Sequence, residues 1–231
     1  MAENVTLAYI ADVSALSDAA LYNAAFGMMP EERKAKTARC RFEKDKLLSV
    51  GAWALLCYAL EREGIDAREL SFDVSCDGKP YIAKGEACFN LSHSGTLVMC
   101  AVSNSELGCD LEKIKDADMD IAERFFHENE YALIKNEADA ERRKALFFRL
   151  WTLKESYVKA TGRGLREPLS SFEISLSERI SVTTEEGLQK LFFAEYTGAP
   201  GYAVSVCTHD GSTEFSEVDL QREVRRWKSA R

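Results

Sequence analysis

The chain has 231 residues and a formal net charge of −8, because 38 acidic residues outnumber 30 basic ones. Hydrophobic residues make up 46% of it and charged residues 29%, which excludes extensive disorder and predicts one large domain or two small ones. The acidic balance disfavours general nucleic-acid binding, which needs a dominant basic surface. It leaves room for a local basic pocket that binds a small phosphorylated ligand.

The seven cysteines are odd in number and include no CxxC pair, and Cys57 and Cys100 lie inside apolar runs. This usage predicts reduced, buried thiols and no zinc site. The N-terminus lacks the pattern of a secretory signal. The longest apolar run, residues 50–60, is too short to span a bilayer. We therefore expect a cytoplasmic protein with no membrane partner.

The pattern of residues 5–13 predicts a strand, and residues 30–60 turn helical. Residues 32–46 carry seven basic residues and three acids, whereas residues 47–63 predict a buried helix that ends near Gly64. Asp77 and Gly78 predict a turn that Pro80 ends. Residues 87–94 and 96–103 then predict two strands joined by a tight hairpin.

The second part of the chain repeats this order of elements. Residues 109–114 predict a strand, helical periodicity returns over residues 120–162, and residues 170–176, 188–196 and 201–208 are strand candidates. Residues 219–229 predict a short final helix. We therefore predict an α+β fold of two similar halves, residues 1–105 and 106–231, that pack on each other.

Two acids of the strand at 109–114 are the first candidate site. Side chains two apart on a strand point to the same face, so Asp110 and Glu112 converge. Neighbouring carboxylates repel unless a cation lies between them, and Mg²⁺ is commonly bound by two or three carboxylates together with phosphate oxygens. The alternative is a surface strand whose acids are both solvated.

The helix that contains residues 150–162 is the second candidate. Trp151, Glu155 and Lys159 recur every four residues and share one face. An acid and a lysine beside a tryptophan suit a binding site, whereas the alternative is an ordinary Glu–Lys pair on a solvated helix.

His93 and the basic stretch are the third and fourth candidates. His93 lies near the hairpin between two serines, where an imidazolium could bind an anion or the serines could satisfy it. The basic residues 32–46 suit a phosphate, or simply form a charged helix face. The hydrolase elbow, the P-loop and the dinucleotide-binding glycine motif are absent.

Five stretches taken in order resemble the successive motifs of Sfp-type 4′-phosphopantetheinyl transferases: DGKP, FNLSHSG, GCDLEKI, FFHENEY and WTLKESYVKATGRGL. The resemblance implies two α/β halves related by a pseudo-twofold, each an antiparallel sheet packed with helices, with coenzyme A in the cleft. It implies an enzyme of the holo-[acyl-carrier-protein] synthase type. Such an enzyme moves the phosphopantetheine arm of coenzyme A to a serine of an acyl or peptidyl carrier protein and releases adenosine 3′,5′-bisphosphate.

The resemblance also implies roles for the candidate residues. Asp110, Glu112 and Glu155 would be ligands of Mg²⁺, or of Mn²⁺ in its place, and Asp110 and Glu155 would also contact coenzyme A. Lys159 would meet the departing phosphate charge, and Lys154, which belongs to the same motif, would also contact coenzyme A. Glu155, or a metal-bound water that it orients, would take the proton of the carrier serine.

The remaining implied contacts lie mostly in the first half. His93, counted among the catalytic residues, and Ser92 would contact the phosphates, while Lys79 and Pro80 would reach the nucleotide end. Arg33 and Lys36 would bind the 3′-phosphate, with Ser49 near the adenosine. Leu48 stands where the family often has an arginine, and Lys46 is a candidate substitute for that arginine. A two-half chain further implies a monomer.

Two alternatives stay open at this stage. One is a protein that binds coenzyme A or a carrier without turnover. The other is a Mg²⁺-dependent phosphohydrolase of small nucleotides, which would need no carrier. The acids together with Lys159 favour the transferase, because a pure binder has no use for a metal site beside a lysine.

Overall fold

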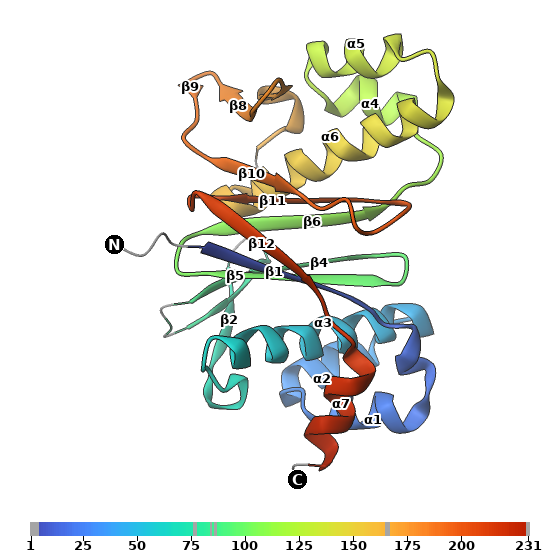
Figure 1. The fold of residues 1–231 in the computed structure, drawn as a ribbon, viewed down its shortest axis with the longest axis vertical. Coiled ribbons are helices and arrows are strands. Elements are labelled where there is room, and N and C mark those ends of the chain that lie inside the picture. Colours follow the sequence, from blue (N-terminus) through green and yellow to red (C-terminus); the bar gives the residue numbers. More distant parts are fainter. Residues whose placement is uncertain (1–4, 76–77, 84, 86, 165–166, 230–231) are drawn as a thin grey trace.

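The computed structural model describes residues 5–75, 78–83, 85, 87–164 and 167–229. Two sheets lie face to face in the middle of the molecule, with helices of the first half below them and helices of the second half above (Figure 1). The predicted α+β fold is confirmed.

The first half contains one strand, a group of helices and four further strands. These are β1 (Val5–Asp12), α1 (Ala19–Gly27), α2 (Glu31–Ala38), α3 (Glu43–Arg62), β2 (Phe72–Val74), β3 (Pro80–Ile82), β4 (Cys88–Ser94) and β5 (Leu97–Ser103), with short 3-10 turns at Ser14–Ser17 and Ala67–Glu69. The helical prediction missed α1, which the Asp18 side chain caps by accepting hydrogen bonds from the backbone N–H groups of Ala20 and Leu21. The turn predicted before Pro80 lies partly outside the described residues, at Cys76 and Asp77.

The second half repeats that order. It contains β6 (Leu107–Lys113), α4 (Met119–Phe125), α5 (Glu128–Asn136), α6 (Ala140–Thr161), β7 (Glu173–Leu176), β8 (Ile180–Thr184), β9 (Gly187–Leu188), β10 (Phe192–Glu195) and β11 (Tyr202–Thr208), with a 3-10 turn at Leu169–Ser171. The sequence analysis did not predict β8.

The two halves share a strand order as well as an element order. β1 pairs with β5 and β5 with β4, and in the same way β6 pairs with β11 and β11 with β10, all antiparallel. In each half the first strand therefore lies beside the last one. This is the structural basis of the two similar halves that the sequence predicts.

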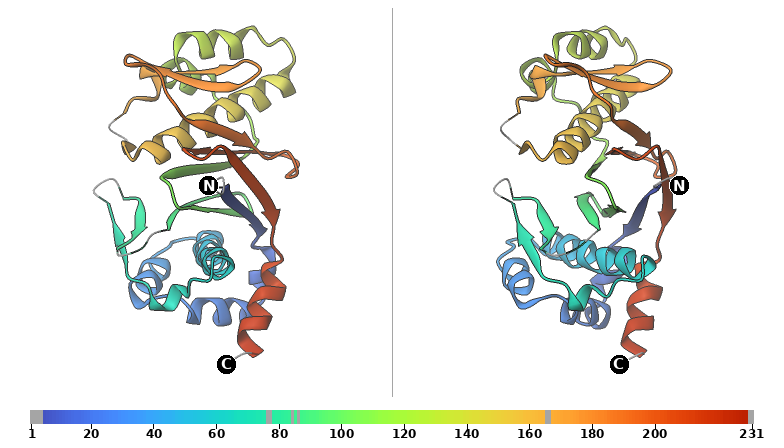
Figure 2. Two further views of the ribbon diagram at one scale, coloured as in Figure 1. Left: turned by 60° about the vertical axis from the view of Figure 1, so that its left-hand side comes forward. Right: turned by 90° about the vertical axis from the view of Figure 1, so that its left-hand side faces the viewer.

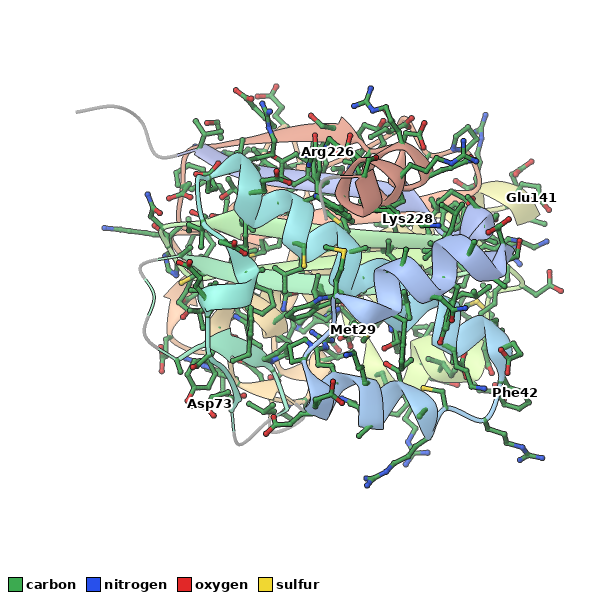
Figure 3. All side chains as sticks on the ribbon, turned by 90° about the horizontal axis from the view of Figure 1, so that it is seen from below. Met29, Phe42, Asp73, Glu141, Arg226 and Lys228 are labelled. Atoms are coloured by element: carbon green, nitrogen blue, oxygen red, sulfur yellow. The ribbon has the colours of Figure 1, made fainter. Side chains whose placement is uncertain are left out.

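The last part of the chain returns to the first half. β12 (Ser212–Glu217) pairs with β1 in parallel, and α7 (Leu220–Ser229) follows it. Helix α7 extends below the sheets (Figure 2) and lies with α1, α2 and α3 on the lower side, where Figure 3 labels Arg226 and Lys228. Arg226 and Glu61 of α3 form an ion pair of 2.5 Å. Residues 212–229, predicted as part of the second half, thus pack on the first.

Three apolar clusters hold the layers together, because side chains alternate across each strand. Tyr9 and Ala11 of β1 join a cluster with α3, whereas Ala8 and Ile10 face the other way, into a cluster between the two sheets. Leu107, Cys109 and Leu111 of β6 complete this central cluster. Phe147, Leu150 and Leu153 of α6 form the third, in the second half.

Polar side chains join β4 to β6 where the two sheets meet. The backbone N–H groups of Cys109, Leu111 and Lys113 donate to side chains of β4, at 2.9, 3.2 and 3.1 Å; the acceptors are Asn90 Oδ1, Ser92 Oγ and Ser94 Oγ in that order. These bonds satisfy an edge of β6 that would otherwise leave unpaired N–H groups beside the apolar cluster.

A second polar contact between the halves centres on Asp210, which follows β11 and is buried. Thr6 Oγ1 donates to Asp210 Oδ2 at 2.9 Å, and Ser103 Oγ donates to the same oxygen. Burial raises the pKa of Asp210, but hydrogen bonds from Ser103, Ser105 and Thr6 outweigh it and leave the pKa below its usual value.

Within the described part of the chain no helix is long and apolar enough to cross a membrane. Cys100, Cys109 and Cys207 are buried free thiols, and burial raises the pKa of each. Cys40 and Cys88 are half-buried free thiols. These five agree with the predicted reduced state, and Cys76 lies outside the described residues.

Candidate active site

Strand β6 and helix α6 approach each other unusually closely. A Cβ atom on Gly108 would lie 2.1 Å from the backbone oxygen of Ser156 and 2.4 Å from the backbone nitrogen of Ala160. Only glycine fits at this point, since real Cβ atoms do not come so near to backbone. The close approach turns Asp110 and Glu112, which lie on the same face of β6 as Gly108, toward α6.

Lys159 of α6 binds the first of these acids. Its Nζ lies 2.7 Å from Asp110 Oδ1 and donates to the backbone oxygen of Cys109 at 3.1 Å. Burial lowers the pKa of Lys159, but the charge of Asp110, its hydrogen bond, and the neighbouring Cys109 and Glu155 together outweigh burial, so the pKa is raised. The charged form of the Lys159 ammonium is therefore favoured beside the acids.

Glu155 lies one turn before Lys159 on the same face of α6. Burial raises the pKa of Glu155, the charges of Asp110 and Glu112 raise it further, and Lys159 only partly opposes them. The structure therefore brings together four predicted site residues: Asp110, Glu112, Glu155 and Lys159. Burial and the two neighbouring acids disfavour the ionised form of Glu155.

Two serines of β4 contact the acids of β6. Ser92 Oγ donates to Asp110 Oδ1 at 2.8 Å, and Ser94 Oγ donates to Glu112 Oε2 at 2.6 Å. Ser92 was predicted as a phosphate contact, but it is buried and its hydrogen is used by Asp110. The sequence analysis assigned no role to Ser94, although its spacing from Ser92 places both on the face that meets β6.

The acids fit a hard divalent cation. Asp110 Oδ2 is buried and without a partner, and Glu155 makes no hydrogen bond or ion pair with another described residue. An orphaned buried carboxylate oxygen is costly unless a cation completes it. As the side chains stand, no three His, Cys, Asp or Glu residues of the described ranges form a ready metal cluster, and the Lys159 ammonium binds Asp110 instead.

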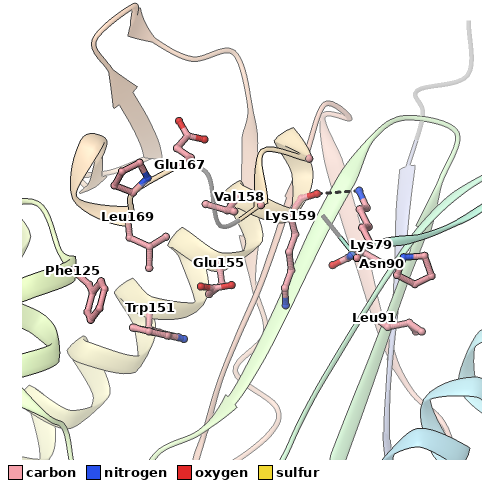
Figure 4. A pocket seen from close by; sticks show the side chains of 15 residues that line it. Lys79, Asn90, Leu91, Phe125, Trp151, Glu155, Val158, Lys159, Glu167 and Leu169 are labelled. Atoms are coloured by element: carbon pink, nitrogen blue, oxygen red, sulfur yellow. Dashed lines mark hydrogen bonds between the residues drawn. The ribbon is translucent and has the colours of Figure 1, made fainter. Parts of the chain in front are cut away.

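Glu155 and Lys159 line a pocket of about 550 Å³ between the halves, and Asp110 contacts the Lys159 ammonium beside it. Trp151, Glu155 and Lys159 face it from α6, and Lys79 and Leu91 lie across from them (Figure 4). Further lining residues are Gly78, Pro80, Asn90, Phe125, Val158, Gly162, Gly164, Glu167, Pro168 and Leu169. The pocket therefore combines an apolar wall with an acidic and cationic one, as small-molecule sites generally do.

Glu167 is a pocket residue that the sequence analysis missed. Its carboxylate pairs with Arg163 at 3.0 Å, and its Oε2 is buried without a partner. A glutamate in a loop after a helix carries no sequence signal that distinguishes it from a solvated one.

Lys79 holds the two halves together at the pocket. Its Nζ donates to the backbone oxygens of Leu107 and Lys159, at 3.0 and 2.9 Å (Figure 4), and pairs with Glu106 at 3.1 Å. Lys79 and Pro80 are in the predicted region, but three acceptors already surround this ammonium. Contact with a nucleotide stays a prediction.

Lys154 does not reach the pocket, contrary to its predicted contact with coenzyme A. The side chain is fully buried, donates to the backbone oxygen of Phe172 at 2.7 Å and lies 2.8 Å from Glu130. Burial lowers the pKa of Lys154 to about 8, although Glu130 opposes it. A buried lysine next to a buried glutamate has a structural role, and it also explains Glu130 in the FFHENEY stretch. In that stretch His127, which had no assigned role, caps α5.

The basic residues lie on α2 and the start of α3, outside the lining of this pocket. Arg33 stacks over Trp53 at 5.0 Å, and burial lowers its pKa. Lys36 is exposed, and Ser49 Oγ lies 2.6 Å from Thr37 Oγ1. Their predicted contacts with the 3′-phosphate and adenosine stay predictions.

Leu48 is a core residue here, and Lys46 pairs with Glu43 at 2.6 Å. Leu48 therefore offers no polar contact to a ligand. His93 is exposed on β4, and its predicted contact with the phosphates stays a prediction.

Comparisons with known proteins agree on one family. Residues 106–207 match the family described as the 4′-phosphopantetheinyl transferase superfamily, and residues 17–105 match that described as 4′-phosphopantetheinyl transferase, N-terminal. A 4′-phosphopantetheinyl transferase of Bacillus subtilis is 34% identical over 180 residues, which cover 76% of this chain and 80% of that protein. One of Bacillus pumilus is 35% identical and covers 77% of each.

A solved structure, the holo-[acyl-carrier-protein] synthase of Thermotoga maritima, is a far more distant likeness. It is 20% identical with a TM-score of 0.38, over 45% of this chain and 62% of that one. The Bacillus transferases match over about three quarters of this chain and show the family, whereas the finer synthase type that the sequence predicts stays a prediction.

Proposed function

Because this chain belongs to the 4′-phosphopantetheinyl transferase superfamily, we propose that it transfers the phosphopantetheine arm of coenzyme A to a serine of an acyl or peptidyl carrier protein. In this reaction the serine oxygen bonds to the phosphorus that carries the arm, the bond to the departing adenosine 3′,5′-bisphosphate breaks, and the serine proton passes to a base. The supporting observation is that Glu155 and Lys159 line one wall of the pocket, where the Lys159 ammonium also binds Asp110.

Asp110, Glu112 and Glu155 are the residues that would hold the divalent cation, for which Asp110 Oδ2 is the free acceptor. When bound, Mg²⁺ would neutralise the pyrophosphate and polarise the phosphorus under attack. Lys159 supplies a fixed positive charge at the same wall, which suits the charge that develops on the leaving phosphate.

Glu155 is our choice for the general base. A general base must lie within reach of the proton that it takes, and the Glu155 carboxylate faces the pocket one turn before Lys159. Among the described residues it also lacks a partner that would compete for the incoming proton.

The test is the intact mass of a panel of apo acyl and peptidyl carrier proteins after incubation with this protein, coenzyme A and Mg²⁺. We expect a gain of one phosphopantetheine that a chelator abolishes, and a carrier whose acceptor serine is replaced by alanine is the control. The carriers that gain mass identify the substrate class.

Two other results would contradict the proposal. Binding of coenzyme A with no mass gain on any carrier would indicate a non-catalytic binding protein. Release of adenosine 3′,5′-bisphosphate at the same rate without a carrier would indicate a phosphohydrolase, since water would then be the acceptor.

A further inference from the structure

Strand β4 meets β6 through side chains rather than backbone. Asn90, Ser92 and Ser94 alternate along β4 and so share a face. Each accepts a hydrogen bond from one backbone N–H of β6. We call these three residues the β4 side-chain row. Its plain structural purpose is to satisfy the β6 edge.

The two serines do something that the asparagine does not. A serine hydroxyl has one hydrogen to donate and two lone pairs that accept. Because Ser92 Oγ and Ser94 Oγ each accept from an N–H of β6, the single hydrogen of each is left for the neighbouring carboxylate. Ser92 donates to Asp110 and Ser94 donates to Glu112. Asn90 Oδ1 makes only the backbone contact, to Cys109.

Each serine occupies one oxygen of one acid. Ser92 shares Asp110 Oδ1 with the Lys159 ammonium, which leaves Oδ2 buried and unpartnered. Ser94 uses Glu112 Oε2. Hydrogen bonds to the outer oxygen of a ligating carboxylate fix its orientation and its affinity for a metal.

We propose that Ser92 and Ser94 are positioning residues that orient Asp110 and Glu112 toward a divalent cation, so that the first half sets the geometry of a metal site built by the second. This inference rests on the proposed function, since it takes the acids as metal ligands. It replaces the predicted phosphate contact of Ser92 with a contact to a carboxylate.

The test measures metal affinity without turnover. Mn²⁺ is titrated into the full-length protein in the presence of coenzyme A and without a carrier, and binding is followed by electron paramagnetic resonance of the free ion. Removing an outer partner of a metal ligand typically costs about 10-fold to 100-fold in affinity. We expect Ser94→Ala to weaken Mn²⁺ binding about 10-fold and Ser94→Thr, which keeps the hydroxyl, to restore most of it.

Ser103→Ala is the matched control, because it also removes a buried serine hydroxyl that donates to a carboxylate, that of Asp210, but lies outside the pocket lining. We expect it to lower the melting temperature and to leave Mn²⁺ affinity within about twofold of wild type. Ser92→Ala and Ser92→Thr repeat the test on Asp110, with the melting temperature recorded to show that each variant is folded. If Ser94→Ala and Ser103→Ala changed Mn²⁺ affinity equally, the two β4 serines would have only a structural role and the inference would be wrong.

The outcome for the two serines can be distinguished from the outcome for the proposed transferase function. A wild-type protein that binds Mn²⁺ but modifies no carrier would contradict the transferase and still test the serines. A wild-type protein that modifies carriers but binds no Mn²⁺ with coenzyme A would overturn the inference and keep the transferase.

Discussion

The outer edges of β1 and β6 differ, although both strands begin a half and lie beside the last antiparallel strand of their own half. Backbone bonds from β12 cover the edge of β1. Side chains of β4 cover the edge of β6. Two equivalent edges are thus satisfied in two different ways.

The long helices of the two halves differ in the same sense. Helix α3 is buried along most of its length, and its residues 50–57 all lie in the core. Helix α6 buries fewer apolar residues than α3 and presents Trp151, Glu155 and Lys159 to the pocket. The first half thus contributes support and the second half the charged groups. The comparison shows that covering a strand edge with side chains, as β4 covers β6, places polar groups between the two halves. Backbone pairing, as between β12 and β1, would place no such side chains there.

The largest expected effect follows from placing the chemistry on the second half. We expect Glu155→Gln to lower kcat/KM of carrier modification about a thousandfold, since a lost metal ligand and base removes several kcal/mol of transition-state stabilisation. Mass spectrometry of the carrier measures the rate. Glu141→Gln, at an exposed acid of the same helix, is the control and should change little. Near wild-type activity in a folded Glu155→Gln variant would contradict the assignment of the catalytic groups to the second half.

The buried pair inside the second half provides the next largest effect, on stability. Lys154→Met leaves Glu130 buried without its cation, and such a change typically costs about 3–5 kcal/mol in the free energy of unfolding. Chemical denaturation measures it, and Lys154→Met combined with Glu130→Gln should recover part of the loss. The same substitution at Lys144, a partly exposed lysine of α6 that pairs with the exposed acids Asp116 and Glu141, should have little effect. An equal loss at both lysines would argue against a buried pair.

Asp210 tests the contact between halves away from the pocket. We expect Asp210→Asn to cost about 1–3 kcal/mol in the free energy of unfolding, because an amide nitrogen replaces an acceptor facing hydroxyl donors. The pKa of Asp210 is below its unfolded value of 3.8. Its stabilisation is therefore complete above that pH and is lost as pH falls through the folded pKa. The difference from wild type, followed by denaturation across pH, should narrow on acidification; a gap that widened would contradict this reading.

The smallest expected effect concerns the attachment of α7 to the first half. Glu61 pairs with Arg226, and both side chains are about half exposed. Exposed ion pairs contribute about 0–1 kcal/mol, so Glu61→Gln should lower the melting temperature only slightly. The shift should shrink further in high salt, which screens such pairs. A large and salt-independent loss would mean that α7 matters more to the first half than its exposed contacts indicate.

Much of the fold could be predicted from the sequence, because its strands and long helices have clear periodicity. The hairpin of β4 and β5, the strand β6 and the helix α6 all lie where the pattern predicts. Strands β2, β3, β8 and β12 were missed. β12 is a short exposed strand, and its burial pattern shows little apolar alternation. Its pairing with β1 depends on a contact across the whole chain, which local patterns do not contain.

The candidate site was predicted unevenly for a similar reason. Spacing alone places Asp110 with Glu112 and Glu155 with Lys159, and the structure brings both pairs together. Spacing cannot tell that Lys154, beside Glu155 in sequence, points into the core rather than into the pocket. Nor can it tell that Ser92 faces a carboxylate rather than solvent, since that depends on how the two sheets meet.

The pairing of β12 with β1 has a consequence for how the protein folds. Val5 lies opposite Ser212, so the outer edge of β1 stays open until residues 212–217 have been synthesised. Contacts of such long sequence separation form late and slow folding. The second half can complete its own three-stranded sheet earlier. We therefore expect nascent chains that stop before residue 212 to expose a strand edge that favours aggregation.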